Sequence, residues 1–349
     1  MDSLLPEEIN QPKVSVLLPN LNNRCFLEER FQTILNQTFA DWELVVVDSY
    51  SDDGAWELIQ EFAKKDSRIR IYQFPREGVY AALNNCIPLA RGEYIYIATS
   101  DDTMTPDCLE KMVAALDAHT NCDLCHCCLT VIDEFGKEIN NNWNAWDKVK
   151  FFGDRIKQEH IRLAPHDGIL YCALGTVYTS LTELMIRKSV FEKVGLFKTE
   201  FGSQGDFEWG LRTSLVCNTV HIPYYLATWR IHSGQVTQNA FIFSSAGQQL
   251  WCEMIESAIN SLKLKQYILP GELDAKKLTF YYRFQQLSIG LGENKIFFKK
   301  IFFILQFLGI RSDVVFNYIA RRFMKKEFYP AVFARKILRQ SNFDKNIYT

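Results

Sequence analysis

Two adjacent carboxylates, Asp101 and Asp102, closely follow the apolar segment at residues 94–98, which reads YIYIA. Ile and Tyr at this density favour a buried strand, whereas two neighbouring ionised carboxylates repel each other and are costly to remove from water. We therefore expect a cation beside the pair. Because no His or Cys adjoins it, the oxygen ligands favour Mg²⁺ or Mn²⁺, completed by the phosphates of a substrate. The alternative for an isolated Asp-Asp pair is a solvated turn.

The elements that must position this pair follow from the spacing of apolar residues. We predict strands at 14–19, 42–48, 69–74 and 94–98, and helices at 26–37, 55–65 and 79–90. Thr105 and Pro106 predict the start of a further helix, with Thr105 as its N-cap. Strands that alternate with helices in this way predict an α/β fold with a mostly parallel, doubly wound sheet. Residues 140–178 show little regular pattern, so we expect a long, partly ordered insertion there.

Each predicted strand ends at residues that could contact a ligand. They are Pro19 and Asn20 at the end of the first, Asp48 at the end of the second, Arg76 past the third, and Asp101 and Asp102 after the fourth. Because ligands bind beyond the carboxyl ends of the strands in doubly wound sheets, we expect these residues to converge on one edge. Neither G-x-G-x-x-G nor G-x-x-x-x-G-K-[ST] occurs, so the dinucleotide fingerprint and the P-loop are not supported.

The net charge of −2 hides a strong asymmetry along the 349 residues. Residues 261–349 hold 17 Lys/Arg and 6 Asp/Glu, which makes this tail about +11 and the rest of the chain about −13. The tail is also rich in Phe, and its pattern is helical beyond residue 236. It predicts contact with an anionic membrane surface, packing on the acidic body, or pairing with a second subunit as a homodimer. We predict no nucleic-acid partner. The apolar run at 301–310 is shorter than the roughly 20 residues that span a bilayer, so we expect no spanning segment.

The ten cysteines lack the regular spacing of a disulfide scaffold and indicate reduced thiols in a cytoplasmic protein. The densest group, at residues 122–128, surrounds His126. Zinc would need a second pair of ligands that the sequence does not supply, so we predict a strand at 124–131 with the cysteines as small apolar residues. The N-terminal residues show no basic segment followed by an apolar one, and we predict no secretory signal.

A series of segments in this order resembles glycosyltransferase family 2, the inverting enzymes of the GT-A fold. The clearest are VSVLLPNLN, QTFADWELVVVDSYSDDG, EGVYAALNNCIPLARGEYIYIATSDD and PDCLEKMVAAL, followed more weakly by RKSVFEKVGLF, GDFEWGLR and WRIHSG. The resemblance covers roughly residues 13–235. It implies a Rossmann-like GT-A catalytic domain at residues 1–235, followed by a helical, basic C-terminal region at 236–349.

The resemblance also implies a nucleotide-sugar site. Its residues are Pro19, Asn20, Asn22, Asp48, Ser51, Arg76, Gly78, Asn84, Ser100 and Asp101. Asp48 would read the base, although a carboxylate there also suits a cap for the following turn. Arg76 would counter phosphate charge, and Gly78 would let the backbone approach the donor.

The metal-binding Asp-x-Asp element of the family corresponds here to residues 99–101, followed by Asp102. Thr99 takes the place of the first aspartate. The resemblance makes Asp101 a direct ligand of Mn²⁺ or Mg²⁺ and Asp102 its support or a holder of water. His232 in WRIHSG matches a late histidine that reaches the metal or the leaving diphosphate.

The family takes its general base from an aspartate at a helix start, in motifs such as E-D-x-x-x-W-L-R. The segment GDFEWGLR supplies Asp206 for this role, with Gly205 where Glu is common and Glu208 as a second candidate. The alternative for Asp206 is a carboxylate that only stabilises the helix dipole. Trp143, Trp146 and His166 suit either an acceptor site, because aromatic faces pack on sugar rings, or the core.

These residues predict a metal-dependent, inverting glycosyltransferase of hexosyl or N-acetylhexosaminyl type. The donor would be a nucleotide sugar, most simply a UDP-sugar, and the acceptor a hydroxyl of a glycan or lipid-linked molecule, as in polysaccharide biosynthesis of the cell envelope. A non-catalytic sugar-nucleotide or glycan-binding module would tolerate the loss of Asp206. A nucleotidyltransferase on a similar fold would carry a Gly-rich basic segment near the first strand. A glycoside hydrolase would not require the Asp101-Asp102 pair.

Overall fold

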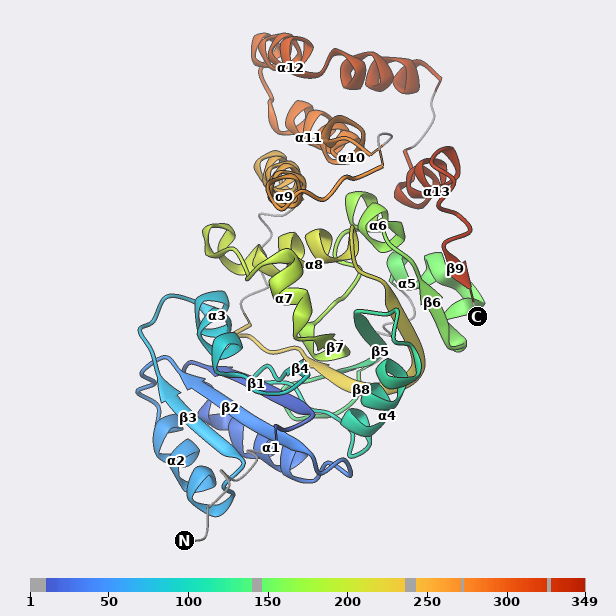
Figure 1. Ribbon diagram of the computed structural model, residues 1–349. Helices are drawn as coiled ribbons and strands as arrows, with labels where there is room; N and C mark the ends of the chain where they lie inside the picture. Colours follow the sequence, from blue (N-terminus) through green and yellow to red (C-terminus); the bar gives the residue numbers. More distant parts are fainter. Residues whose placement is uncertain (1–10, 140–145, 236–242, 271–272, 325–327, 349) are drawn as a thin grey trace, which may run out of the picture.

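One nine-stranded mixed sheet forms the centre of the molecule, in the order β3-β2-β1-β4-β7-β5-β8-β6-β9. The computed structural model describes residues 11–139, 146–235, 243–270, 273–324 and 328–348. Helices cover both faces of the sheet, and the C-terminal helices stack beyond one face (Figure 1). This arrangement confirms the predicted α/β class and the helical C-terminal region.

The first half of the sheet is parallel and closely matches the predicted elements. Its strands are β1 (Val14–Asn20), β2 (Trp42–Asp48), β3 (Ile69–Gln73) and β4 (Tyr94–Ile97). The helices between them are α1 (Arg24–Leu35), α2 (Ala55–Lys65) and α3 (Val79–Leu89). In Figure 1, α1 and α2 lie on one face of these strands and α3 on the other.

The next helix, α4 (Cys108–Ala118), begins later than predicted, and its N-cap is Asp107 rather than Thr105. The reason is that Thr105 is held by another strand. Its N–H donates to the Leu226 carbonyl at 2.9 Å, and its hydroxyl donates to Asp107 at 2.6 Å. The turn before α4 is therefore tied to the middle of β8.

The second half of the sheet contains two reversed strands. It consists of β5 (Leu124–Ile132), β6 (His160–Arg162), β7 (Leu184–Arg187), β8 (Thr219–Arg230) and β9 (Ile347–Tyr348). The strands β6 and β7 run antiparallel to their neighbours, whereas the other strands share one direction. The prediction of a mostly parallel sheet is confirmed. The longest strand is β8, which carries two apolar runs, TVHIP and YYLATW, in one element.

The prediction of an irregular insertion at 140–178 is wrong for the described residues 146–178. They form α5 (Asp147–Phe152), the 3₁₀ helix η2 (Gly153–Lys157), β6 and α6 (His166–Leu174). A buried ion pair anchors the segment, because Arg162 Nε donates to Asp167 Oδ2 at 2.8 Å and Tyr178 Oη donates to the same oxygen at 3.1 Å. Arg162 and Asp167 of this segment are therefore buried.

The C-terminal half of the chain is mostly helical, and its helices stack outward from the sheet. It comprises α7 (Ser189–Val194), η4 (Thr199–Gln204), α8 (Gly205–Ser214), α9 (Ser245–Leu264), α10 (Ala275–Leu278), α11 (Phe280–Glu293), α12 (Phe297–Phe323) and α13 (Pro330–Gln340). The main core continues from the sheet into α9 and α13, and a smaller core joins α11 to α12. The prediction of a wholly helical tail misses β9, which pairs with β6. The domain boundary predicted after residue 235 adjoins residues 236–242, which lie outside the described ranges, and it stays a prediction.

Among the described residues, one helix, Phe297–Arg322, is long and apolar enough to cross a membrane, judged by its length and composition alone. The expectation of no spanning segment considered only the uninterrupted apolar run at 301–310. The observed helix continues well beyond that run, although its backbone leaves helical geometry at Arg311, where φ is −145° and ψ is 68°.

We predict that Asp167→Asn destabilises the fold by about 3–5 kcal/mol at pH 7, because it leaves Arg162 buried without its charge partner. Burial opposes ionisation of Asp167, yet the charge of Arg162 and the His166 hydrogen bond hold its pKa below the ordinary value of 3.8. The stabilising contribution is therefore full above about pH 4 and is lost as the pH falls through the lower, folded-state pKa. Urea unfolding at pH 7 and at pH 3 measures both effects.

The control is the double variant Arg162→Met/Asp167→Leu, which removes both charges and should recover much of the lost stability. Equal stability of Asp167→Asn and wild type at pH 7 would show that the pair contributes nothing to the folded state.

Candidate active site

The two carboxylates after β4 face different surroundings. Asp102 is buried, and its Oδ1 accepts the backbone N–H of Arg230 at 2.7 Å. Its Oδ2 accepts hydrogen bonds from the hydroxyls of Thr99 and Ser180. Asp101 keeps 21% of its side chain exposed. Asp102 therefore supports the turn from inside, and Asp101 is the carboxylate available to a ligand.

Burial and the charge of Asp101 raise the pKa of Asp102 to about 7. Hydrogen bonds from Thr99 and Arg230 and the charge of the buried Arg30 act in the opposite direction. The raised pKa relieves the repulsion between the two acids, because Asp102 can hold a proton near neutral pH. This explains in part how an apolar strand can end in two carboxylates.

The cation expected beside the pair has a counterpart in Arg230, at the end of β8. The guanidinium is buried, and its Nε donates to the Asp101 carbonyl oxygen at 2.6 Å. It also pairs with Glu29 of α1 at 2.7 Å and donates to the carbonyls of Asp133 and Glu134. The guanidinium thus binds the backbone of the acidic turn and leaves the Asp101 carboxylate exposed.

His232 lies directly beside that carboxylate, although the two residues are 131 positions apart. Its Nε2 is 3.1 Å from Asp101 Oδ2, and its ring lies 4.9 Å from the ring of Phe26. Mg²⁺ and Mn²⁺ commonly take one or two protein ligands and complete their coordination with water and phosphate. The oxygen of Asp101 and the nitrogen of His232 fit such an ion. Asp102 does not face it, and no group of three or more His, Cys, Asp or Glu arranged for a metal exists among the described residues.

The loops after β1 and β2 are tied together at the same edge of the sheet. Asp48 is buried, with Oδ1 accepting from Asn20 Nδ2 at 2.8 Å and from Ser51 Oγ at 2.6 Å, and with Oδ2 accepting the Ser51 N–H at 2.9 Å. Asn22 exchanges two hydrogen bonds of 2.9 Å with Asp52. The buried Oδ1 of Asn20 has no hydrogen-bond partner within the described ranges. An acceptor in this position suits an N–H donor from a ligand.

Arg76 and Gly78 border the same loops. Arg76 donates to the carbonyls of Ser49 and Tyr50 and pairs with Asp52 at 2.8 Å. The hydrogen bond and the charge of Arg76 lower the pKa of Asp52. Gly78 precedes α3 at φ +96°, and a Cβ there would meet no atom within 4 Å. The backbone at the start of α3 is therefore open to an approaching group.

Two residues of the predicted site are engaged elsewhere. The amide of Asn84 exchanges hydrogen bonds with the backbone of Phe197 at 2.8 and 3.0 Å. Glu208 is buried and pairs with Arg212 at 2.8 Å and with Lys198 at 3.7 Å. Both side chains hold helices in place, so we leave them out of the site proposed below.

Asp206 starts α8 close to the N-terminus of α3, which begins just past β3 and hence at the carboxyl edge of the sheet. Gly205 explains the contact, because a Cβ there would lie 2.7 Å from the Tyr80 ring and 2.8 Å from the Lys198 carbonyl. The glycine that replaces the usual glutamate of the motif thus has a steric reason. Burial and the neighbouring Asp206 carboxylate raise the pKa of Tyr80 well above its usual value.

The sequence did not single out Arg230, Asn23 or Ser180. Arg230 stands two positions before His232 in WRIHSG, so a search for the cation required by Asp101 and Asp102 had a signal to follow. Asn23 Nδ2 donates to Ser100 Oγ at 2.6 Å, and Ser180 reaches Asp102 at 3.4 Å. These contacts join residues 77 and 78 positions apart and leave no local pattern.

The expected aromatic acceptor site is only partly described. Trp143 lies outside the described residues. Trp146 packs edge-on against Trp229 with ring centroids 5.5 Å apart, next to the buried Arg230. His166 is buried beside Asp167, at 2.9 Å, and belongs to the core. Trp146 therefore stays a candidate for contact with an acceptor, and the role of Trp143 stays a prediction.

Comparison with known proteins identifies the family. Residues 15–195, more than half of the chain, match the model described as Glycosyl transferase family 2. EpsE of Bacillus subtilis (strain 168), which carries a provisional glycosyltransferase name, is 36% identical over 127 residues, covering 36% of this chain and 46% of EpsE. The uncharacterized glycosyltransferase MJ1057 of Methanocaldococcus jannaschii is 31% identical over 161 residues, covering 45% and 56%. The match thus spans about half the length of these curated relatives.

Solved structures share the fold. Residues 1–349 of TarS from S. aureus, in complex with UDP-GlcNAc, align with a TM-score of 0.59 and 13% identity, covering 95% of this chain and 91% of that one. The mannosyltransferase PcManGT from Pyrobaculum calidifontis, in complex with GDP-Man and Mn²⁺, aligns with a TM-score of 0.51 and 16% identity, covering 98% and 90%. These structures show the fold, and the match over residues 15–195 shows that the chain belongs to glycosyl transferase family 2, a family of glycosyltransferase enzymes.

Proposed function

We propose that this chain is an inverting glycosyltransferase that transfers a sugar from a nucleotide donor to an acceptor hydroxyl with the help of a divalent metal ion. The observation that carries the proposal is the pairing of Asp101 with His232 beside the turn after β4. The Asn20, Asp48 and Ser51 cluster lies at the same edge, because β1, β2 and β4 are adjacent and parallel. The same edge of the sheet therefore carries one group of residues suited to a metal ion and phosphate and a second group suited to the nucleoside.

The donor we propose is a UDP-sugar. The unpartnered Oδ1 of Asn20 and the carboxylate of Asp48 suit a base that presents an N–H, as uracil does at N3. The TarS structure, which has the higher TM-score of the two neighbours above, contains UDP-GlcNAc. PcManGT contains GDP-Man, so GDP is the competing nucleotide to test.

Asp101 and His232 would hold Mg²⁺ or Mn²⁺ against the diphosphate. A divalent ion there supplies positive charge where negative charge grows on the leaving nucleoside diphosphate. Asp206 takes the proton from the acceptor hydroxyl while the hydroxyl oxygen attacks the anomeric carbon. Attack from the side opposite the diphosphate breaks the bond between that carbon and the diphosphate oxygen and inverts the configuration. Asp206 lies in the first turn of α8, where the helix dipole stabilises negative charge.

The acceptor we propose is a glycan or a lipid-linked molecule of cell-envelope polysaccharide synthesis. TuaG of Bacillus subtilis, whose provisional name assigns it to teichuronic acid biosynthesis, is 35% identical over 104 residues and supports this direction. The cytoplasm is the proposed compartment. All ten cysteines are free and nine of them are buried, as expected for thiols kept reduced.

Asp206→Asn should lower kcat by about 10²–10⁴-fold, because the amide cannot accept the acceptor proton. Donor affinity should stay unchanged, since the metal and nucleoside contacts remain. The measurement pairs turnover of a UDP-sugar with calorimetric binding of UDP in Mn²⁺. As a control, Glu208→Gln should reduce thermal stability instead, because it weakens the buried pair with Arg212. Near-normal turnover by Asp206→Asn would remove Asp206 from the role of base.

Asp101→Asn should weaken Mn²⁺-dependent binding of UDP at least about tenfold, because a direct ligand is lost. Isothermal titration with UDP, and separately with GDP, in the presence of Mn²⁺ or EDTA measures the change. The matched control is Asp154→Asn, which changes an exposed carboxylate in η2 that pairs with Lys157. If wild type binds neither nucleotide with metal, the donor site is wrong and a binding module for glycans becomes the better interpretation.

A further inference from the structure

The long helix α12 is apolar on two sides. Its inner side contributes Phe307, Val314 and Val315 to the small core shared with α11. Its outer side leaves Phe298 79%, Phe302 61% and Leu305 58% exposed. The exposed residues Phe298, Ile301, Phe302, Leu305, Phe316 and Ile319 form what we call the outer stripe. A helix side that is apolar is normally covered, and among the described residues only the inner side of α12 packs on another helix.

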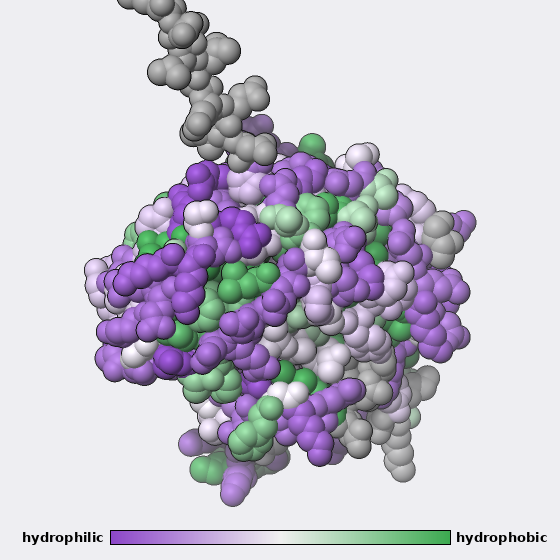
Figure 2. Space-filling model, turned by 90° about the horizontal axis from the view of Figure 1, so that it is seen from below, coloured by the Kyte–Doolittle hydropathy of each residue, from purple (hydrophilic) through white to green (hydrophobic). Residues whose placement is uncertain are grey.

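Positive charges flank the outer stripe. Exposed Lys295 and Lys299 stand near its start, and exposed Arg322 stands at its end. The single acidic residue of α12, Asp313, pairs with Arg311 at 3.0 Å. The face at the other end of the molecule differs, because Figure 2 shows mostly hydrophilic residues there, with a smaller hydrophobic group near the centre. In Figure 1, α12 lies farthest from the sheet, at the outer edge of the helical stack.

The anchoring of Arg311 favours a helix that lies flat over one that spans a bilayer. Arg311 is buried where the helix geometry breaks, and its guanidinium donates to the Thr279 hydroxyl at 3.0 Å and to the Lys276 carbonyl at 2.9 Å. Pulling α12 away to cross a membrane would break these bonds and expose the inner core. With Arg311 in place, the outer stripe can enter only the interface of a bilayer.

Charge also argues against a second copy as the covering partner. In a symmetric dimer the same surface meets itself. If two α12 helices paired antiparallel, Lys299 of one copy would face Arg322 of the other. If they paired parallel, each cation would face its own equivalent. Both arrangements bring like charges together, whereas an anionic surface neutralises them.

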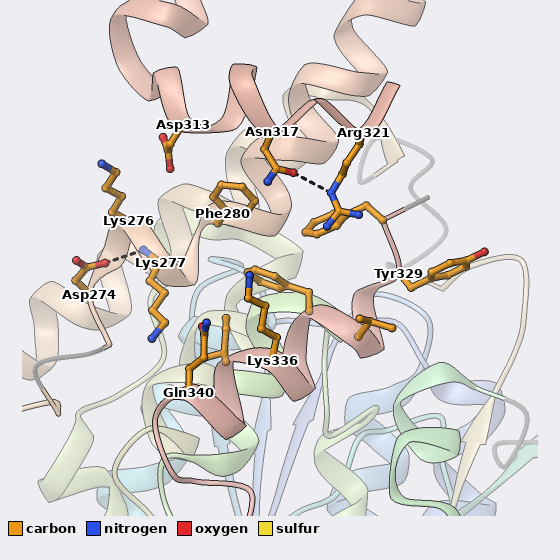
Figure 3. Close-up of a pocket in the computed structure, with 14 residues that line it drawn as sticks. Asp274, Lys276, Lys277, Phe280, Asp313, Asn317, Arg321, Tyr329, Lys336 and Gln340 are labelled. Atoms are coloured by element: carbon orange, nitrogen blue, oxygen red, sulfur yellow. Dashed lines mark hydrogen bonds between the residues drawn. The ribbon is translucent and has the colours of Figure 1, made fainter. Parts of the chain in front are cut away.

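A cavity of about 450 Å³ between α10, α11, α12 and α13 shows the same combination of chemistry (Figure 3). Its lining includes the aromatic rings of Phe280, Phe328 and Phe333, and four cations, Lys276, Lys277, Arg321 and Lys336, that outnumber the two carboxylates, Asp274 and Asp313. Figure 3 shows Lys277 from α10 and Lys336 from α13 extending into the same space. Cations set against an apolar wall suit the phosphate of a lipid headgroup together with the start of its chain.

We propose that the α10–α13 region docks this protein on an anionic lipid bilayer, with the outer stripe of α12 in the interface and a lipid phosphate in the neighbouring cavity. The proposal goes beyond the transfer reaction and does not depend on it. None of the residues involved belongs to the nucleotide-sugar site.

Flotation of the full chain with vesicles tests the docking. Wild type should bind vesicles of phosphatidylcholine mixed with phosphatidylglycerol and should bind pure phosphatidylcholine vesicles weakly. Phe298→Ser/Phe302→Ser/Leu305→Ser should weaken binding more than about tenfold, since three inserting side chains are lost. The control Phe135→Ser/Leu264→Ser/Ile268→Ser removes three exposed apolar side chains elsewhere and should bind like wild type. All substituted positions are exposed, and circular dichroism checks folding.

Lys299→Gln and Lys336→Gln test the charges, and each should weaken binding about fivefold, with the effect decreasing at high salt. Equal binding to neutral and anionic vesicles, or binding by the outer-stripe variant equal to that of the control, would overturn the proposal. The proposal would also be overturned if wild type did not bind vesicles and light scattering showed that wild type is a dimer while the outer-stripe variant is a monomer. UDP titration of the same variants separates this outcome from failure of the proposed function.

Discussion

The arrangement of the candidate active site depends on the contacts of one buried guanidinium, that of Arg230. It connects α1 through Glu29, the acidic turn after β4 through the Asp101 carbonyl, and the turn after β5 through the Asp133 and Glu134 carbonyls. Because the side chain binds the backbone carbonyl of Asp101 and not its carboxylate, that carboxylate remains available. The backbone N–H of the same residue satisfies Asp102. One residue of β8 therefore positions both carboxylates and, two positions later, His232.

The two faces of α12 bear on two of the three interpretations of the basic tail. Packing on the body was one expectation, and the inner side of α12 packs on α11, which in turn packs on α9. Contact with an anionic surface was another, and the outer stripe with its flanking cations supports that proposal. A single helix can serve both because residues three and four apart share a face, so opposite sides of it carry independent patterns.

Local patterns predicted the elements up to α3 closely because apolar spacing is set within each segment. The strand β2 and the helix α2 have the predicted bounds. The prediction of an irregular segment at 140–178 was wrong because its order rests on the burial of the pair Arg162–Asp167, and two charged residues five apart match neither the helix nor the strand period. The engagement of Glu208 with Arg212 did have a local signal, since the two stand four apart on one helix.

The sequence by itself determined the family, the strand ends and the residue types of the candidate site, because these reside in contiguous motifs and in periodicity that one segment carries alone. Only the tertiary structure decided which candidates meet. It placed His232 beside Asp101, turned Asn84 toward Phe197, and brought β9 to β6. Contacts between distant segments depend on how the sheet is ordered and how helices pack on it, and that order is a property of the whole chain.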